Sequence, residues 1–502
     1  MAFKVLFIYS NPRTMSLVPT SIALFSKLLK AIDVSVALFD TTLYDNKNES
    51  ADSDKLEEKD LLVKPFSDNL NRYKDKIKYK HTNQHEDLEK MISRFNPDLL
   101  AVTAVESTFL ESINLLKSIR HHKIPAIVGG VFATFASDIA ISYPEIDMIC
   151  VGEGERAMVE LVRKMQAGKD YSTIQNLWVK KKDGSIVKNP IAPPVNLDDN
   201  PLIDIEIYED SRFYRAMDGK IYKMFPVETH RGCVYNCGFC NSPLQNKMYK
   251  DATGKKFFRH KSIPKVKDEI EYFIKLGAEY IFLWADNFFA YPQKMIDEFC
   301  EMYSEIKLPF YCQSHPESLC VEKIEKLKAV GMQRVGVGLE HGNEKFRREI
   351  VKRNYSNEML IERLKILTDL EVQYSVNNII GFPGETPELV MDTVELNRRH
   401  SASDISCSIF TPFQGTSLRK MALDLGYLKN TNILAHSNSE ASVLDMPQFP
   451  PDKILGKRRT FNMYIKFPKD RWKEIMPAEE MTPEGDTAWQ RLKREYIATF
   501  IK

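Results

Sequence analysis

The stretch Cys233-Val-Tyr-Asn-Cys237-Gly-Phe-Cys240 places three thiols within eight residues, just after the apolar run 224–229. Such a run is typical of a strand that ends in a loop. Thiolates are soft metal ligands, and in a reducing compartment a cysteine cluster is more often a metal site than a disulfide. The spacing therefore predicts that Cys233, Cys237 and Cys240 bind a metal.

Three cysteines are one short of a closed zinc site or a four-cysteine iron–sulfur site. A [4Fe–4S] cluster held by these three thiolates would leave one iron open to a small molecule. The alternatives from spacing alone are a partial zinc knuckle or three unrelated buried thiols.

The composition describes a chain of 502 residues, 43% hydrophobic and 28% charged, which suits two or three domains with their own cores. The 70 Lys and Arg against 69 Asp and Glu give a net charge of +1, so no global field favours nucleic acid. No apolar run approaches the roughly 18 residues of a membrane span, and we expect no transmembrane segment or signal peptide. The eight cysteines favour a reducing cytoplasm.

Strands alternate with helices in the first third of the chain, which predicts an α/β domain over residues 1–165 with a doubly wound parallel sheet. The strands are expected at 3–9, 34–39, 99–105, 126–128 and 148–151, and the helices at 17–31, 85–95, 108–120 and near 136–142. The strongly polar segment 45–80 is interpreted as a surface insertion.

Ligands of such a sheet bind outside the carboxyl ends of its strands. Those ends carry Ser10-Asn11, residues 106–108, Gly129-Gly130 and Gly152-Glu153-Gly154-Glu155. Gly129-Gly130 would let the backbone approach a bulky ligand closely, with a simple tight turn as the alternative. The first strand is followed by no G-x-G-x-x-G, which argues against a dinucleotide fold.

Residues 166–223 are predicted to link two domains. Asp183-Gly184 indicates a hairpin between 176–180 and 185–188, and four prolines follow it between 190 and 201. Residues 416–502 are predicted to form a helical C-terminal region.

A second α/β alternation predicts a partial (β/α)6 barrel over residues 224–415, with its chemistry at the carboxyl ends of the strands. The strands are expected at 224–229, 280–284, 310–313, 334–339, 374–380 and 405–410, and the helices at 264–276, 292–305, 321–329, 356–369 and 387–399.

The C-x3-C-x2-C spacing, with Phe239 before the third cysteine, resembles the signature of radical S-adenosylmethionine (SAM) enzymes. Three strand ends resemble the same family: 284–288, the Gly-Val-Gly-Leu-Glu340 segment, and 378–386. The resemblance implies that the open iron binds SAM and that its reductive cleavage yields a 5′-deoxyadenosyl radical. The implied SAM contacts are Phe239, Asp286, Asn287, Glu340, Gly381 and Glu385, although Asp286 and Asn287 are equally typical of a helix N-cap.

The first domain is similar to the cobalamin-binding domain that precedes the radical SAM barrel in one large subfamily. Its landmarks here are Asn11-Pro12, 128–130 and 149–155. The implied cobalamin contacts are Asn11, Ser107, Gly129, Gly130, Gly152 and Glu153. The first strand is not followed by the Asp-x-His-x-x-Gly of the better-known cobalamin pattern, so the lower axial ligand of cobalt is left open.

This resemblance implies a methyltransferase that acts on an unactivated carbon through a 5′-deoxyadenosyl radical and methylcobalamin. The alternative is a non-methylating radical SAM enzyme that catalyses cyclisation, ring rearrangement or carbon–carbon coupling. A third hypothesis is a cluster-bearing sensor without turnover. The expected partners are a small-molecule or lipid substrate and an electron donor such as flavodoxin or ferredoxin.

Other residues carry weaker signals. His315 is placed where substrate would lie, whereas Cys312 and Cys320 are more typical of ordinary core thiols. Phe449-Pro450-Pro451 and 461–465 could form an apolar pocket for substrate, and helix packing is the favoured alternative.

Overall fold

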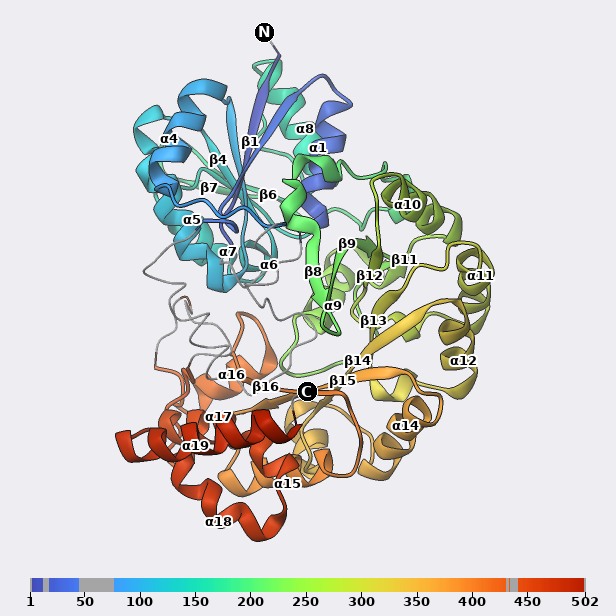
Figure 1. Cartoon of the computed structure of the whole chain (residues 1–502). Coiled ribbons are helices and arrows are strands. Elements are labelled where there is room, and N and C mark those ends of the chain that lie inside the picture. Colours follow the sequence, from blue (N-terminus) through green and yellow to red (C-terminus); the bar gives the residue numbers. More distant parts are fainter. Residues whose placement is uncertain (1, 12–17, 45–75, 430–432, 434–440, 501–502) are drawn as a thin grey trace.

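The computed structural model describes residues 2–11, 18–44, 76–429, 433 and 441–500. Most of the predicted polar insertion, residues 45–75, and Pro12 of the Asn11-Pro12 landmark lie outside this range. Within these residues the protein contains two seven-stranded sheets, a two-stranded ribbon and a helical C-terminal region. In Figure 1 the first sheet lies at the top, the second curves through the right-hand side, and the C-terminal helices lie at the bottom.

The first sheet has the strand order β2-β1-β3-β4-β5-β6-β7, and its first five strands are parallel. These are β1 (Lys4–Tyr9), β2 (Ser35–Asp40), β3 (Leu99–Thr103), β4 (Ala126–Gly129) and β5 (Met148–Cys150). The helices are α1 (Thr20–Lys30), α4 (Gln84–Phe95), α5 (Glu106–Ser118), α6 (Val131–Phe135), α7 (Ser137–Ser142) and α8 (Glu155–Gln166). The predicted doubly wound parallel sheet is confirmed.

Strand β1 shows why this sheet is covered on both faces. Val5 and Phe7 pack in one core cluster with residues of α1 and α8, whereas Leu6 and Ile8 pack in another with residues of α4 and α5. Successive side chains of a strand point to opposite faces, so a continuous apolar run requires helices on both sides.

The first sheet continues beyond the predicted domain boundary at residue 165. Strands β6 (Leu177–Lys180) and β7 (Ile186–Lys188) form the expected hairpin and pair antiparallel with β5. The hairpin covers the edge of β5, which a free linker would leave open. The connection between the two sheets therefore starts after Lys188, and it contains the short 3₁₀ turns η2 (Leu197–Asp199), η3 (Ile205–Ile207) and η4 (Asp210–Phe213).

The second sheet has the order β16-β15-β14-β13-β12-β9-β8. Its six parallel strands, β9 (Lys220–Glu228), β12 (Tyr280–Trp284), β13 (Phe310–Ser314), β14 (Met332–Glu340), β15 (Gln373–Ile380) and β16 (Asp404–Ile409), confirm the predicted partial barrel. Strand β8 (Tyr214–Met217) adds an antiparallel edge. Helices α10 (Ile263–Lys275), α11 (Gln293–Tyr303), α12 (Val321–Val330), α14 (Asn357–Asp369) and α15 (Pro387–Asn397) connect these strands. Figure 1 shows α10, α11, α12 and α14 along the outer rim.

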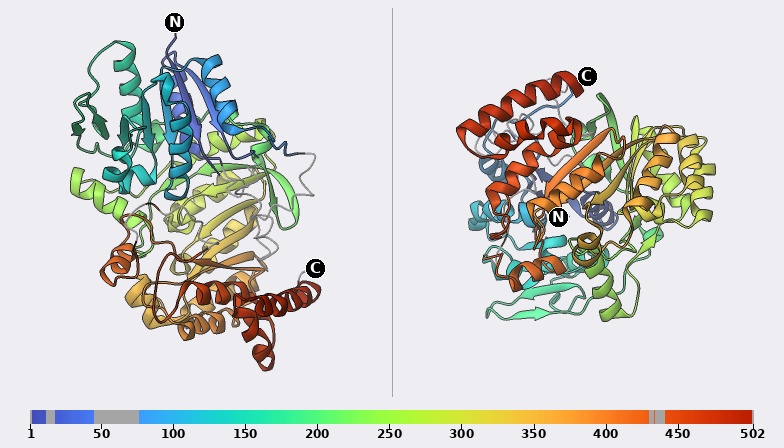
Figure 2. Two further views of the ribbon diagram at one scale, coloured as in Figure 1. Left: turned by 90° about the vertical axis from the view of Figure 1, so that its left-hand side faces the viewer. Right: turned by 90° about the horizontal axis from the view of Figure 1, so that it is seen from below.

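The C-terminal region consists of α16 (Ser417–Asp424), α17 (Pro451–Lys466), α18 (Trp472–Ile475) and α19 (Pro483–Phe500). Helix α17 packs against α15 and β16, and Figure 2 shows these helices gathered at one end of the molecule. Phe449, Phe461 and Met463 are buried, so the apolar stretches act in helix packing. Among the described residues, the helices include none that is long and apolar enough to cross a membrane.

Candidate functional site

The cysteine loop, residues 232–241, connects β10 (His230–Arg231) to α9 (Ser242–Thr253). Three hydrogen bonds fix its path. The Asn246 side-chain amide donates to the Cys233 carbonyl (2.7 Å), Gly238 N–H donates to the Val351 carbonyl (2.9 Å), and Leu418 N–H donates to the Gly238 carbonyl (3.2 Å). The loop is therefore held by α9, by the segment after β14, and by α16, which are far apart in the sequence.

The thiols of the loop have the environment expected for a metal site. Cys237 is buried, and Cys233 and Cys240 are half-buried. Burial raises the pKa of Cys233 to about 12 and also raises the pKa of Cys240. Both thiols are therefore protonated at neutral pH without a metal, and binding of iron must release these protons. Three soft donors on a fixed loop fit the predicted [4Fe–4S] cluster.

Arg353 is a site residue that sequence reasoning missed. Its chain segment follows the π-helical turn η7 (Arg347–Val351), and its side chain returns to the cysteine loop. Its Nε lies 3.2 Å from Cys237 Sγ, its Nη1 donates to the Gly338 carbonyl at 2.5 Å, and its Nη2 lies 3.4 Å from Glu340 Oε1. A fixed cation therefore lies between a predicted cluster ligand and a predicted SAM contact.

Glu340 ends β14 in the left-handed backbone region, with φ of +66°. Its carboxylate is 8% exposed and faces Arg353. Burial raises the pKa of Glu340, whereas the charge of Arg353 lowers it. Eight other non-glycine residues of the described chain share this backbone region, so the contact of Glu340 with SAM stays a prediction.

Replacement of Arg353 by glutamine is expected to make the cluster harder to reduce, because the variant lacks the cation and the hydrogen bond beside Cys237 Sγ. The reduction midpoint, measured by EPR-monitored redox titration, should become more negative by tens of millivolts. Arg353→Lys keeps the charge, so its reduction midpoint should lie between those of Arg353→Gln and the native protein. An unchanged midpoint in Arg353→Gln would exclude this role.

The two predicted SAM contacts after β12, Asp286 and Asn287, differ in exposure and in their hydrogen bonds. Asp286 is exposed and accepts a hydrogen bond from the Ser242 hydroxyl at 2.8 Å, so its carboxylate remains accessible to a ligand. Asn287 is 1% exposed, and its side chain binds His315 N–H and the Ser318 hydroxyl. The Asn287 amide is therefore engaged in joining two strand ends.

His315 lies beside the cysteine loop. Its ring stacks on Tyr235, between Cys233 and Cys237, at a centroid distance of 3.6 Å. The side chain is 4% exposed, and burial together with the charge of Arg353 lowers its pKa to about 2. His315 is neutral at working pH and acts here as a flat packing surface for the loop. Cys312 is fully buried, in agreement with a core thiol.

Gly381 and Glu385 form a closed turn after β15. The Glu385 carboxylate accepts hydrogen bonds from Gly381 N–H and Phe382 N–H, and it lies 3.0 Å from His341 Nε2. Both Glu385 and His341 are fully buried. This carboxylate shapes the loop, and the contacts of Gly381 and Glu385 with SAM stay predictions. Phe239 lies 6.2 Å from the Phe382 ring, between centroids.

Replacement of Glu385 by alanine is expected to destabilise the protein by about 3–5 kcal/mol, because buried donors and His341 lose their acceptor. Glu385→Gln keeps one acceptor oxygen, so it should lower the free energy of unfolding by less than Glu385→Ala. Urea unfolding of the metal-free protein measures both free energies. Equal stability of Glu385→Ala and the native protein would contradict this structural role.

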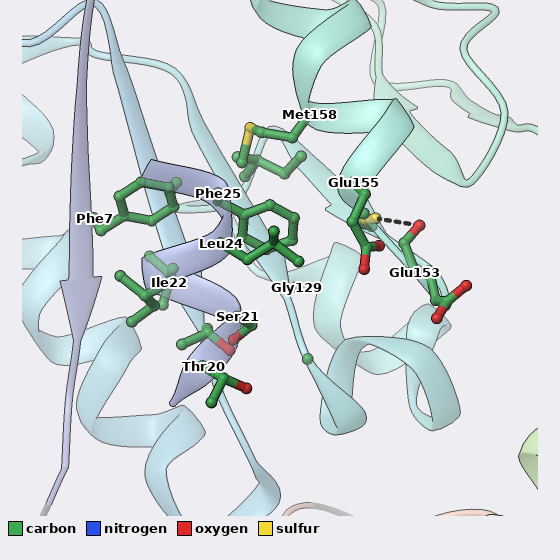
Figure 3. Close-up of a pocket in the computed structure, with 18 of the residues that line it drawn as sticks. Phe7, Thr20, Ser21, Ile22, Leu24, Phe25, Gly129, Glu153, Glu155 and Met158 are labelled. Carbon is green, nitrogen blue, oxygen red and sulfur yellow. Dashed lines mark hydrogen bonds between the residues drawn. The ribbon is translucent and has the colours of Figure 1, made fainter. Parts of the chain in front are cut away.

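A pocket of about 230 Å³ opens at the carboxyl edge of the first sheet. Figure 3 shows Phe7, Ile22, Leu24 and Phe25 along one wall, with Gly129, Glu153 and Glu155 opposite. Of the predicted cobalamin contacts, Gly129, Gly130, Gly152 and Glu153 line it, whereas Asn11 and Ser107 do not. The wall is largely apolar inside, and its rim carries Glu153, Glu155 and Glu228 together with Arg231.

Two glycines make this rim possible. Gly130 has φ of +100°, and a Cβ there would lie 2.6 Å from the Ala104 carbonyl oxygen. Gly152 has φ of +82°, and a Cβ there would lie 2.5 Å from the Tyr249 hydroxyl. Both positions therefore require glycine for close backbone approach.

Glu228 and Arg231, which precede the cysteine loop, line the same pocket. Residues of the second sheet region thus complete a cavity that starts in the first domain. The pocket therefore lies between the two domains, and its lining residue Arg231 stands two positions before Cys233 in the sequence.

Comparisons with known proteins agree with both halves of this description. Residues 227–396 match the family model of the Radical SAM superfamily, and residues 73–162 match that of the B12 binding domain. An uncharacterised methyltransferase of Pyrococcus horikoshii is 25% identical over 397 residues, covering 78% of this chain and 83% of the relative. An anaerobic magnesium-protoporphyrin IX monomethyl ester cyclase of Rubrivivax gelatinosus is 24% identical, covering 66% of this chain and 60% of the relative.

Among solved structures, the radical SAM methyltransferase TsrM of Kitasatospora setae, with cobalamin and a [4Fe–4S] cluster bound, is similar along its whole length. The TM-score is 0.66 with 16% sequence identity, covering 99% of this chain and 100% of that chain. The arrangement of two sheets and a helical end is thus a known one. The chain belongs to the radical SAM enzymes that carry an N-terminal B12 binding domain.

Proposed function

We propose that the protein is a cobalamin-dependent radical SAM methyltransferase that methylates an unactivated carbon of a small-molecule or lipid substrate. The observation that carries this proposal is the position of the pocket between the two domains. The pocket at the edge of the B12 binding domain is completed by Glu228 and Arg231, and Cys233 follows two residues later. A cofactor in the pocket would therefore lie next to the cysteine loop.

When bound, the cofactors would supply the hydrogen-abstracting 5′-deoxyadenosyl radical and a methyl group carried on cobalt. The protein residues hold and orient them. Cys233, Cys237 and Cys240 are the thiolate ligands on the fixed loop. Gly129, Gly130 and Gly152 allow the backbone to approach a large ligand at the pocket.

Glu340 and Arg353 form a pair of opposite charges that complements the methionine end of SAM. An ammonium group would be bound by the Glu340 carboxylate and a carboxylate group by the Arg353 guanidinium. Both side chains are at most 9% exposed, so water competes weakly for these charges. Asp286, which remains exposed beside the loop, is a second acceptor for the ammonium group.

Apolar side chains at the strand ends would exclude water from the reacting atoms. Trp284 ends β12 with 42% of its surface exposed, and Val234 in the cysteine loop is 53% exposed. Burial of apolar surface against a substrate is favourable, so we expect the substrate to carry an apolar face.

The test is product analysis under anaerobic conditions, with reconstituted enzyme, a chemical reductant and SAM that carries a deuterated methyl group. The proposal predicts 5′-deoxyadenosine, S-adenosylhomocysteine and labelled methyl on enzyme-bound cobalamin. Formation of 5′-deoxyadenosine alone, with no labelled cobalamin, would favour the non-methylating alternative. Formation of neither nucleoside product would contradict enzymatic function.

A further inference from the structure

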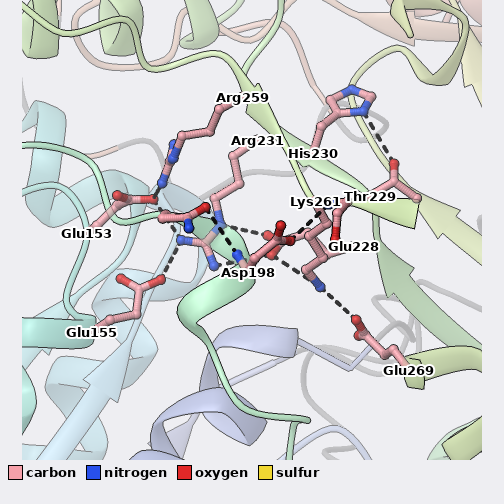
Figure 4. Close-up of polar contacts among 12 residues, drawn as sticks. Glu153, Glu155, Asp198, Glu228, Thr229, His230, Arg231, Arg259, Lys261 and Glu269 are labelled. Carbon is pink, nitrogen blue, oxygen red and sulfur yellow. Dashed lines mark hydrogen bonds and ion pairs between the residues drawn. The ribbon is translucent and has the colours of Figure 1, made fainter. Parts of the chain in front are cut away.

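The pocket rim, residues 152–155, is tied to the cysteine loop by a buried network of ion pairs. Figure 4 shows Arg231 and Arg259 directed at Glu153, with Glu155 below Glu153 and next to the Arg231 guanidinium. Arg231 Nη1 lies 2.7 Å from Glu153 Oε1 and also contacts Glu155, while Arg259 Nη2 contacts Glu153. The four side chains are at most 18% exposed. Two glutamates of the B12 binding domain are thus neutralised by two arginines of the radical SAM half.

Both arginines belong to one short ribbon that leads into the cysteine loop. Strand β10 pairs antiparallel with β11 (Arg259–His260), with Arg231 opposite Arg259. Arg231 also binds Glu228 through its Nε at 2.8 Å. Cys233 follows Arg231 by two residues, with only Gly232 between them. Movement of the rim would therefore displace the amino-terminal end of the loop.

A second contact holds the rim from the other end of the loop. The Tyr249 hydroxyl accepts a hydrogen bond from Glu153 N–H at 2.7 Å, and Tyr249 is fully buried. Tyr249 lies on α9, which begins directly after the loop that contains Cys240. Glu153 is thus held by two residues that flank the cysteine loop. Arg231 precedes Cys233 and binds the Glu153 carboxylate, and Tyr249 follows Cys240 and binds the Glu153 N–H.

We infer that these contacts couple the two cofactor sites, so that a filled pocket stabilises the cluster-binding loop and a bound cluster tightens the pocket. The inference rests on the proposed binding of cobalamin. Arg231 and Tyr249 act in it as positioning residues. Coupling between sites is reciprocal, so the cluster and cobalamin must raise each other's affinity by the same factor.

The experiment measures the dissociation constant of hydroxocobalamin for two forms of the full-length protein. One form carries the reconstituted cluster, and the other is the triple variant Cys233→Ala, Cys237→Ala, Cys240→Ala. The ratio of the two constants is the coupling factor. Such factors are typically about 5- to 150-fold, and we expect tighter binding by the cluster-loaded form.

The variant Tyr249→Phe removes one hydroxyl and keeps the ring, and Glu153→Gln weakens the ion pairs without changing shape. For each variant the dissociation constant is measured with the cluster and with the three cysteines replaced. The ratio of the two constants should fall towards one, even if the variant also changes the affinity for hydroxocobalamin. The matched control is Glu479→Gln, which weakens the half-buried ion pair of Lys457 and Glu479 in the C-terminal region. This control should keep the native coupling factor.

A coupling factor of one in the native protein would overturn the inference. A native factor that persists in both Tyr249→Phe and Glu153→Gln would overturn its assignment to these contacts. Absence of hydroxocobalamin binding by both protein forms would instead contradict the proposed function. Retention of iron by Tyr249→Phe, measured by metal analysis, shows that the variant is folded around its cluster.

Discussion

Replacement of Cys237 by alanine should abolish cluster binding and all SAM cleavage. Cys237 is the most buried thiol of the loop, and its Sγ receives a hydrogen bond from Arg353. Two remaining thiolates cannot hold a cluster that needs three protein ligands and an open iron. We expect iron after anaerobic reconstitution to fall from about four atoms per chain to near zero, and 5′-deoxyadenosine to fall below detection.

The control for this prediction is Cys312→Ala. Cys312 is fully buried in β13 and its Sγ packs against the Met332 sulfur at 3.7 Å. Its replacement costs packing energy of about 1 kcal/mol but leaves the cysteine loop intact. Full iron content in Cys237→Ala, or loss of iron in Cys312→Ala, would contradict the assignment of the ligands.

Replacement of Gly129 by leucine should fill the cofactor pocket and weaken cobalamin binding. A Cβ at Gly129 has ordinary space, because its nearest neighbour is Cys150 Cβ at 3.9 Å. The longer side chain would then occupy volume of the 230 Å³ pocket. Overpacking costs about 1–3 kcal/mol, which corresponds to roughly 5- to 150-fold weaker binding. Titration with hydroxocobalamin, followed by absorbance, measures the change.

The variant Cys150→Ala provides a matched control on the same wall, because it enlarges the pocket instead of filling it. It should keep cobalamin affinity within a few-fold of the native value. Iron content after reconstitution without cobalamin should remain native in both variants, since both positions lie in the first sheet and the three cysteines are unchanged. If Gly129→Leu binds hydroxocobalamin as tightly as the native protein, the cofactor does not occupy this pocket.

The sequence predicts the strands of both sheets well, for a physical reason. Parallel strands buried on two faces are continuous apolar runs, and 280–284 is one that matches β12 residue for residue. The glycines at 129–130 and 152 also follow from sequence, because a strand end that must admit a ligand leaves few other choices.

Features that depend on distant chain segments escaped prediction. Arg353 approaches Cys237 across 116 residues, through a π-helical turn that has no simple sequence pattern. The hairpin β6–β7 has strand and turn signals, but its attachment to β5 is a property of the free sheet edge. The segment predicted as a linker thus contributes two strands, β6 and β7, to the first sheet. The ion pairs of Arg231 and Arg259 require both domains to be in place.

All the predicted cobalamin contacts stay predictions, and two of them, Asn11 and Ser107, do not line the pocket. Asn11 instead hydrogen-bonds Thr41 and Thr42 at the carboxyl end of the neighbouring strand. Both residues lie at the same edge of the sheet as the pocket, where the bulk of a large ligand could extend.

We propose that one chain binds an iron–sulfur cluster and cobalamin at neighbouring sites. The most direct test is anaerobic reconstitution with iron, sulfide and hydroxocobalamin, followed by metal analysis of the desalted protein. The account predicts about four irons and one cobalt per chain. Four irons without cobalt would agree with cluster binding by the radical SAM half, and would contradict cobalamin binding by the pocket of the first domain.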